Sequence, residues 1–237
     1  MIHQFRHDLQ EPRYYLKLKE LKKINRLKVS DIEEKETWRW NYYRIAYREV
    51  ASNTNARTVI STILPKKLLC GHKLFVETIS VEKKNFKTSL STEQKFFSTG
   101  VFNSFVFDYL ARFLVSTTVS KTYFMRLPFP RLENGDLYFD ETVERSAKLI
   151  CYAPEFNELA ESVGLNWEKD GIPPSEEIQR IKLRGEIDAM VAKIYQLNKT
   201  QFEHVLNSVK AGKDSDTPLK RYMDKIKAEA LKAYGKL

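Results

Sequence analysis

Side chains that can bind nucleic acid are concentrated between residues 38 and 58, in a run that is also rich in tryptophan and tyrosine. Arginine can donate two parallel hydrogen bonds to a phosphate or a guanine edge, and asparagine can bind an adenine edge in the same way. Threonine hydroxyls commonly contact phosphate oxygens. The candidate DNA-binding residues of this run are Arg44, Arg48, Asn53, Asn55, Arg57 and Thr58.

A structural interpretation competes with the functional one. The tryptophan and tyrosine side chains of this run are expected to form core, and the arginines could pair with Glu49 or Asp108 inside the fold. For Asn55 and Arg57 both interpretations stay open.

Lysines extend the basic character beyond this run, and the sequence has a net charge of +9, with 40 basic and 31 acidic residues. Residues 1–30 carry a charge of +5, whereas residues 141–209 carry 8 basic and 12 acidic residues. A basic part beside an acidic block favours a surface for a polyanion and a second part with another role. Solvated lysine-rich faces that keep a protein soluble are the alternative. The lysines expected to contact phosphate are Lys66, Lys67, Lys83, Lys84 and Lys87.

The usual enzyme motifs are absent from the sequence. It has no glycine-rich phosphate loop, no cysteine or histidine cluster at zinc spacing and no Gly-x-Ser-x-Gly motif. Glu77, Glu82 and Lys83 resemble part of a metal-dependent nuclease motif, but no acidic partner stands out, and both carboxylates are expected to be solvated. The two cysteines are far apart, and no stretch reaches the roughly 20 apolar residues of a membrane span. We expect a cytoplasmic protein with no membrane partner and no catalytic, metal or cofactor site.

The residue pattern predicts an α+β fold, in which a mixed strand-and-helix domain is followed by a helical block. β-branched and aromatic residues predict strands, and the i, i+3, i+4 spacing of Phe102, Phe105, Val106, Tyr109, Leu110 and Phe113 predicts one long helix. Thr200 with Glu203 predicts a capping box, and Thr217 with Pro218 predicts another helix start. The expected strands cover residues 38–50, 57–64 and 73–81, with an extended segment at 123–130. The expected helices cover residues 14–28, 92–114, 141–152, 155–163, 173–197, 200–212 and 217–235. The expected domains are residues 1–140, 141–212 and 213–237.

Four segments of the chain, taken in order, resemble one protein family. The first is Met-Ile-His-Gln-Phe-Arg-His at residues 1–7, and the second is R-x-x-x-R-x-x-A-x-x-T-N-x-R-T at residues 44–58, which continues to Ile-Leu-Pro at 63–65. The third is N-S-F-V-F-D-Y-L-x-R at residues 103–112 with Leu-Pro-Phe-Pro at 127–130, and the fourth is a helical pair within residues 183–206. Together they resemble the region that follows the methyltransferase domain in type IIG-like restriction–modification enzymes and in related adenine-specific DNA methyltransferases of phage-defence systems.

The resemblance implies a target recognition region, the part that reads the DNA sequence. The chain lacks the Asn-Pro-Pro-Tyr/Phe motif and the S-adenosylmethionine motif of such enzymes. We therefore expect the methyltransferase domain or subunit, with S-adenosylmethionine and possible Mg²⁺, to lie upstream in a parent protein or to be encoded by the other part of a split gene. Arg6 stands where the family usually has Asp, so no role is transferred to it. Asp108 with Arg112 is expected to form an internal pair, and Asp188 to be a buried structural partner.

Two functions follow as hypotheses. The first is a non-catalytic module that recognises double-stranded DNA by sequence. The alternative is a protein-interaction scaffold or subunit of a defence complex, which an exposed apolar patch on the 178–197 helix would favour. A nuclease active by itself is the least favoured.

Overall fold

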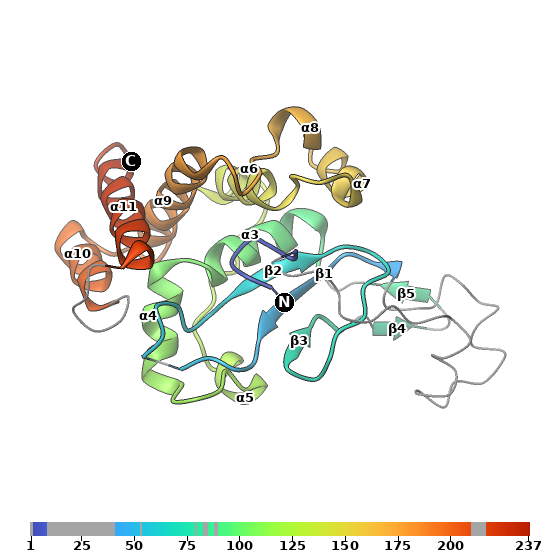
Figure 1. Cartoon of the computed structure of the whole chain (residues 1–237), viewed down its shortest axis with the longest axis horizontal. Coiled ribbons are helices and arrows are strands. Elements are labelled where there is room, and N and C mark those ends of the chain that lie inside the picture. Colours follow the sequence, from blue (N-terminus) through green and yellow to red (C-terminus); the bar gives the residue numbers. More distant parts are fainter. Residues whose placement is uncertain are drawn as a thin grey trace.

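The computed structural model describes residues 2–8, 41–52, 54–78, 80–82, 85–87, 90–209 and 217–237, and its fold is α+β, as the sequence predicts (Figure 1). A three-stranded antiparallel sheet has the order β2-β1-β3, and a separate hairpin pairs β4 with β5. The strands are β1 (Arg44–Arg48), β2 (Ser61–Leu64), β3 (Leu74–Val76), β4 (Ser80–Glu82) and β5 (Asn85–Lys87). β1, β2 and β3 lie within predicted strands but are shorter, β4 overlaps the end of the third, and β5 was not predicted. Residues 14–28 and 38–40 lie outside the described part.

Helices make up most of the remaining described chain. They are α3 (Thr92–Phe102), α4 (Phe105–Leu114), α5 (Lys121–Phe124), α6 (Phe139–Ile150), α7 (Asn157–Glu161), α8 (Trp167–Asp170), α9 (Glu177–Ile194), α10 (Lys199–Ser208) and α11 (Pro218–Tyr234), with a short 3-10 helix, η3 (Pro154–Phe156). None of the described helices is long and apolar enough to cross a membrane. Thr217 caps α11 as predicted, whereas α10 begins with a capping box of Asn198 and Gln201, earlier than predicted.

The predicted single helix over residues 92–114 is two helices. Asn103 ends α3, and the Ser104 hydroxyl caps α4 by accepting a hydrogen bond from the Phe107 N–H at 3.1 Å. The side chain of Asn103 is engaged elsewhere: its amide donates to the Ser61 carbonyl at 2.9 Å, and its carbonyl accepts from the Ser61 N–H at 3.0 Å. The break changes the buried face, so that Phe107 is in the core and Phe113 is at the surface.

The two faces of the sheet are covered by different segments. Ile45 and Ile63, which are paired in register, belong to the main core together with residues of α3. The opposite face, with Arg44 and Ala46, is packed against Ile2 and the chain that connects β2 to β3. Beyond α3, the helices α6 and α9 form a further layer, and α11 packs outside α9 (Figure 1). The main core therefore contains buried residues from both sides of residue 140.

The first described residues are built into the interior. Phe5 and Gln4 are buried, and the Phe5 N–H donates to the Ser61 carbonyl at 3.1 Å. The Gln4 amide donates to the Asn103 carbonyl at 3.1 Å and accepts a hydrogen bond from Arg184 of α9. Asp188 of α9 accepts a hydrogen bond from the Phe105 N–H, the first residue of α4, at 2.6 Å. Asp188 is thus a buried structural partner, as predicted, that joins the helical block to the strand-and-helix part.

The Asp188 carboxyl predicts a pH-dependent stability. Burial raises its pKa from 3.8 to about 6, and the nearby Arg57 guanidinium opposes this rise only in part. Between these values the folded state binds more protons than the unfolded state, so the free energy of unfolding falls as the pH rises from about 4 to about 6. Asp188→Asn is expected to remove up to about 3 kcal/mol of this fall.

Urea unfolding of the wild type and the variant from pH 4 to pH 7 measures the effect. Asp224→Asn, which changes an exposed carboxylate on α11, is the matched control and is expected to leave the profile unchanged. Parallel pH profiles for the wild type and Asp188→Asn would contradict the prediction.

Candidate nucleic-acid interface

The polar run singled out in the sequence contains a turn at residues 52–58, of which residue 53 is not described. The Ser52 carbonyl accepts hydrogen bonds from the Asn55 N–H at 3.1 Å and from the Thr58 hydroxyl at 3.2 Å. The Ser52 hydroxyl also accepts from the Thr54 N–H at 3.2 Å. Serine and threonine favour such turns because their hydroxyls bond nearby backbone groups. Thr54 and Asn55 are exposed at this turn, whereas Thr58 is buried.

Two side chains of α4 hold the turn from inside the molecule. One carboxylate oxygen of Asp108 accepts hydrogen bonds from the N–H groups of Thr58 and Val59 at 2.7 and 2.9 Å, and the other accepts from Arg112 Nε at 2.9 Å. Arg112 in turn donates to the carbonyls of Asn55 and Ala56 at 2.8 and 3.1 Å. The predicted internal pair of Asp108 and Arg112 is confirmed. We call Asn103, Asp108 and Arg112 the loop anchors, because all three bind the backbone of residues 55–61.

Arg57 lies beneath the turn, with only 5% of its surface exposed. Its guanidinium donates to the Asn103 carbonyl, packs over the Phe105 ring at 4.2 Å and lies 4.0 Å from an Asp108 oxygen. Burial lowers the pKa of Arg57, whereas Asp108 and Asp188 act in the opposite direction. Two carboxylates and an aromatic face thus surround a buried cation, which is how a charge is retained in a protein interior.

Three residues assigned to DNA contacts lie in the interior and cannot reach a duplex. Thr58 and Arg57 are buried behind the turn, and Arg57 has the alternative, structural role of facing Asp108 inside the fold. Arg44 is buried on the covered face of the sheet, where it donates to the Leu68 carbonyl at 2.6 Å. A side chain on that face meets the chain between β2 and β3, which the strand pattern alone does not reveal.

The remaining predicted contacts are dispersed. Asn55 is exposed at the turn, and Arg48 is partly exposed at the end of β1. Lys66 and Lys67 follow the opposite end of β2, so the structure does not bring them to the turn. Lys66 pairs with Glu158 and lies over the Tyr43 ring at 5.1 Å, while Lys67 is exposed. Asn53, Lys83, Lys84 and the side chain of Lys87 lie outside the described residues.

Glu77 departs from its expected solvated state. Both of its carboxylate oxygens accept hydrogen bonds from the ammonium of Lys95 on α3, at 2.7 and 2.6 Å, and one also accepts from the Ile45 N–H at 3.2 Å. Burial lowers the pKa of Lys95, and Glu77 opposes that change. The pair therefore joins α3 to the sheet and is structural.

The distribution of charge distinguishes two sides of the molecule. Residues 50–76 and 109–132 contain eight lysines and arginines and no aspartate or glutamate, whereas residues 133–177 contain twelve acidic and three basic residues. The first two segments include the turn, most of α4 and all of α5. The acidic stretch includes α6, α7 and α8, which lie on the other side of the molecule from α4 and α5 (Figure 1). Lys121, Arg126 and Arg131 are the exposed cations of the second segment, so a polyanion would be attracted to the surface around α5.

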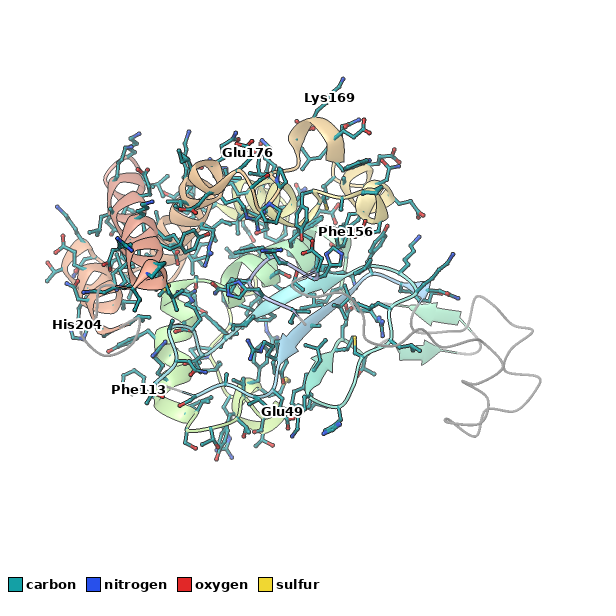
Figure 2. All side chains as sticks on the ribbon, viewed as in Figure 1. Glu49, Phe113, Phe156, Lys169, Glu176 and His204 are labelled. Atoms are coloured by element: carbon teal, nitrogen blue, oxygen red, sulfur yellow. The ribbon has the colours of Figure 1, made fainter. Side chains whose placement is uncertain are left out.

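The side that carries the turn and α5 presents exposed side chains that the sequence analysis did not single out. Lys121 and Arg126 are exposed on and just after α5, and Phe113 is exposed in the last turn of α4. This surface is joined to β1, because the Val119 N–H donates to the Glu49 carbonyl at 2.7 Å and Val50 forms a bridge with Thr118. Figure 2 labels Glu49 and Phe113 along this lower side and Lys169 and Glu176 at the opposite edge. The absence of acidic residues over 109–132 is the sequence signal that could have identified it.

Comparison of the chain with protein-family models, with curated proteins and with solved structures finds no match. The resemblance given above therefore stays a prediction. Among the described residues, no group of three or more histidine, cysteine, aspartate or glutamate side chains could hold a metal ion.

The loop anchors predict a large effect of a small substitution. Asp108→Asn would place an amide donor against the Arg112 guanidinium and remove the negative charge beside the buried Arg57, so we expect the free energy of unfolding to fall by about 3–5 kcal/mol. Chemical denaturation measures the loss.

The matched control is Glu144→Gln, because Glu144 and Lys148 form a pair with the same i, i+4 spacing at the surface, 2.5 Å apart. That substitution is expected to cost less than about 1 kcal/mol. Equal losses of unfolding free energy in the two variants would show that the buried Asp108 carboxylate stabilises the fold no more than a surface carboxylate does.

Proposed function

We propose that this chain is a non-catalytic module that recognises double-stranded DNA by sequence, within a restriction–modification or phage-defence adenine methyltransferase. The observation that carries the proposal is the anchored turn with exposed Asn55, set in a surface whose two segments contain no acidic residue. Such a surface combines the two requirements of sequence-specific binding, which are attraction to phosphates and a fixed polar group for a base edge.

The residues would divide this work according to their chemistry. Lys121 and Arg126 would neutralise phosphates, since their cations are exposed and lie in a segment without carboxylates. The Asn55 side chain carries a donor and an acceptor side by side, which matches the Hoogsteen edge of adenine in the major groove. The loop anchors hold the backbone of the turn before DNA arrives, so that less conformational entropy is lost on binding.

Methyl transfer is assigned to a separate upstream methyltransferase domain or subunit, which would bind S-adenosylmethionine and possibly Mg²⁺. The module would position a chosen adenine for extrusion into that partner's site. The alternative function, a protein-interaction scaffold, was tied to an exposed apolar patch on the 178–197 helix. On α9 the apolar side chains Ile181, Ile187 and Met190 are buried, and Ile178 is exposed at its start. We therefore favour DNA recognition.

The first test of this proposal is the salt dependence of duplex binding. The full chain is titrated by fluorescence anisotropy into a labelled duplex of about 30 base pairs, from about 50 to about 200 mM salt. Log affinity is expected to fall linearly with log salt, and the double variant Lys121→Ala/Arg126→Ala is expected to reduce the slope by about 1.8, the value for two phosphate contacts.

The matched control is Lys169→Ala/Lys182→Ala, which removes two exposed lysines from α8 and α9. Because Lys169 lies in the acidic stretch and neither residue belongs to residues 50–76 or 109–132, the control is expected to bind like the wild type. A flat salt response of the wild type, or an equal loss in both double variants, would reject the proposed surface.

The second test concerns sequence preference. Selection of bound duplexes from a random library is expected to yield a preferred sequence that contains adenine, and Asn55→Ala is expected to relax the preference at one position by about 1–3 kcal/mol of discrimination. Thr54→Ala, next to it at the exposed turn, removes a hydroxyl that is suited to phosphate and serves as the control. It should change affinity with little change in preference. Identical preferred sequences for the wild type and Asn55→Ala would exclude Asn55 from base reading.

A further inference from the structure

Exposed apolar side chains gather on the same side as the turn. Ten large apolar side chains are exposed in the described residues, and five of them lie at Val50 or within residues 113–125. We call these five the α4–α5 rim: Val50, Phe113, Leu114, Tyr123 and Met125. Phe113 and Met125 are the most exposed, at 70% and 73%. A concentration of this kind is unusual for a surface that has no partner to cover it.

Phe113 and Met125 both project from well-packed parts of the fold. The Phe113 ring rests edge-on against Tyr109 at 5.0 Å, and Tyr109 in turn meets the His204 ring of α10 edge-on at 6.0 Å. Figure 2 shows the labels of Phe113 and His204 on the same side of the molecule. Arg112, the residue before Phe113, donates a hydrogen bond to the turn as one of the loop anchors. Phe113 is therefore supported at its base, while most of its surface is open to solvent.

Aromatic packing holds the residue that precedes Met125. Met125 ends α5, and the preceding residue, Phe124, is stacked on Tyr47 at 4.2 Å with an angle of 7° between the rings. Phe124 also packs edge-on against Phe102 and Phe107. This packing holds α5 against β1 and α4, and it leaves Met125 outside the core.

The charges around the rim identify the occupant. Arg112 in residues 109–132 is already paired with Asp108, whereas Lys121, Arg126 and Arg131 are exposed, and the segment contains no acidic residue. A second copy of this face would bring like charges together, and the apolar surface of a neutral protein would offer these three exposed cations no negative charge. A duplex supplies both complements, because its phosphates match the cations and its base pairs offer apolar faces to a side chain that enters between them.

We propose that Phe113 is a wedge that enters a base step of the bound duplex, with Met125 as a second apolar contact. Insertion of an apolar side chain unstacks the step and kinks the DNA, which allows more of the protein surface to reach the phosphates. A kink beside the turn would also lower the cost of extruding a nearby base, since the neighbouring stacking is already lost. The inference rests on the proposed function and adds to it a mode of DNA deformation.

The experiment measures binding and bending together. A mixed-sequence duplex of about 30 base pairs carries a donor and an acceptor dye at its two ends, so that bending raises energy transfer. The full wild-type chain is expected to raise the transfer on binding. Phe113→Ala is expected to abolish the rise and to weaken binding about tenfold, the size of the loss of one aromatic stacking contact. Phe113→Leu, which keeps an apolar wedge, should retain most of the bending.

Ile178→Ala is the matched control, since Ile178 is 84% exposed but lies at the end of the acidic stretch. It should bind and bend DNA like the wild type, and circular dichroism should show an unchanged fold for every variant. If Phe113→Ala bends the duplex as the wild type does, or if the wild type binds with a steep salt response and does not bend it, the wedge is rejected and DNA recognition stands. If the wild type does not bind the duplex at all, both proposals fail.

Discussion

The structure depends on one buried electrostatic interaction, that of the Asp108 carboxylate with its four partners. It accepts two backbone N–H groups from residues 58 and 59, pairs with Arg112 and faces the guanidinium of Arg57. Residues 54–59 precede β2 and have few ladder hydrogen bonds of their own, so their buried polar groups need partners from elsewhere. An apolar side chain at position 108 could fill the same space, but it could accept no hydrogen bond from these buried groups. An irregular segment with buried N–H groups therefore needs a polar side chain, here that of Asp108, to accept their hydrogen bonds.

The same requirement explains how the helical block is joined to the rest. Asn103 binds Ser61 through its side chain and Gln4 and Arg57 through its carbonyl, and Gln4 continues the chain of hydrogen bonds to Arg184 on α9. Asp188, one turn later on α9, accepts from the first N–H of α4, where the helix dipole favours a negative group. Displacing α9 would break contacts at α4 and at the first described residues together, so α9 is held in a fixed position relative to α4.

The sequence predicted the fold class, the order of the main elements, the Asp108–Arg112 pair and the burial of Asp188. It did not predict the break between α3 and α4, because the stripe from Phe102 to Phe113 has helical spacing throughout, and the break depends on Asn103 bonding to a strand more than forty residues away. The burial of Arg44 was missed for the same reason, and for Arg57 the sequence left burial and DNA contact both open. A basic side chain in a short strand or turn looks like a surface contact unless its long-range partners, here the Leu68 and Asn103 carbonyls, are known.

These burials change which residues we propose as DNA contacts. Arg44 and Arg57 are buried and donate to the Leu68 and Asn103 carbonyls, whereas Arg48 is partly exposed and Asn55 is exposed at the turn. The exposed cations Lys121, Arg126 and Arg131 come from a different stretch, after α4, where sequence spacing shows no motif and only the lack of carboxylates sets the segment apart. A buried cation costs desolvation energy and gains little affinity for a ligand. The buried arginines of this motif are therefore better understood as structural, and under the proposed function the contacts to DNA would come from exposed residues around them.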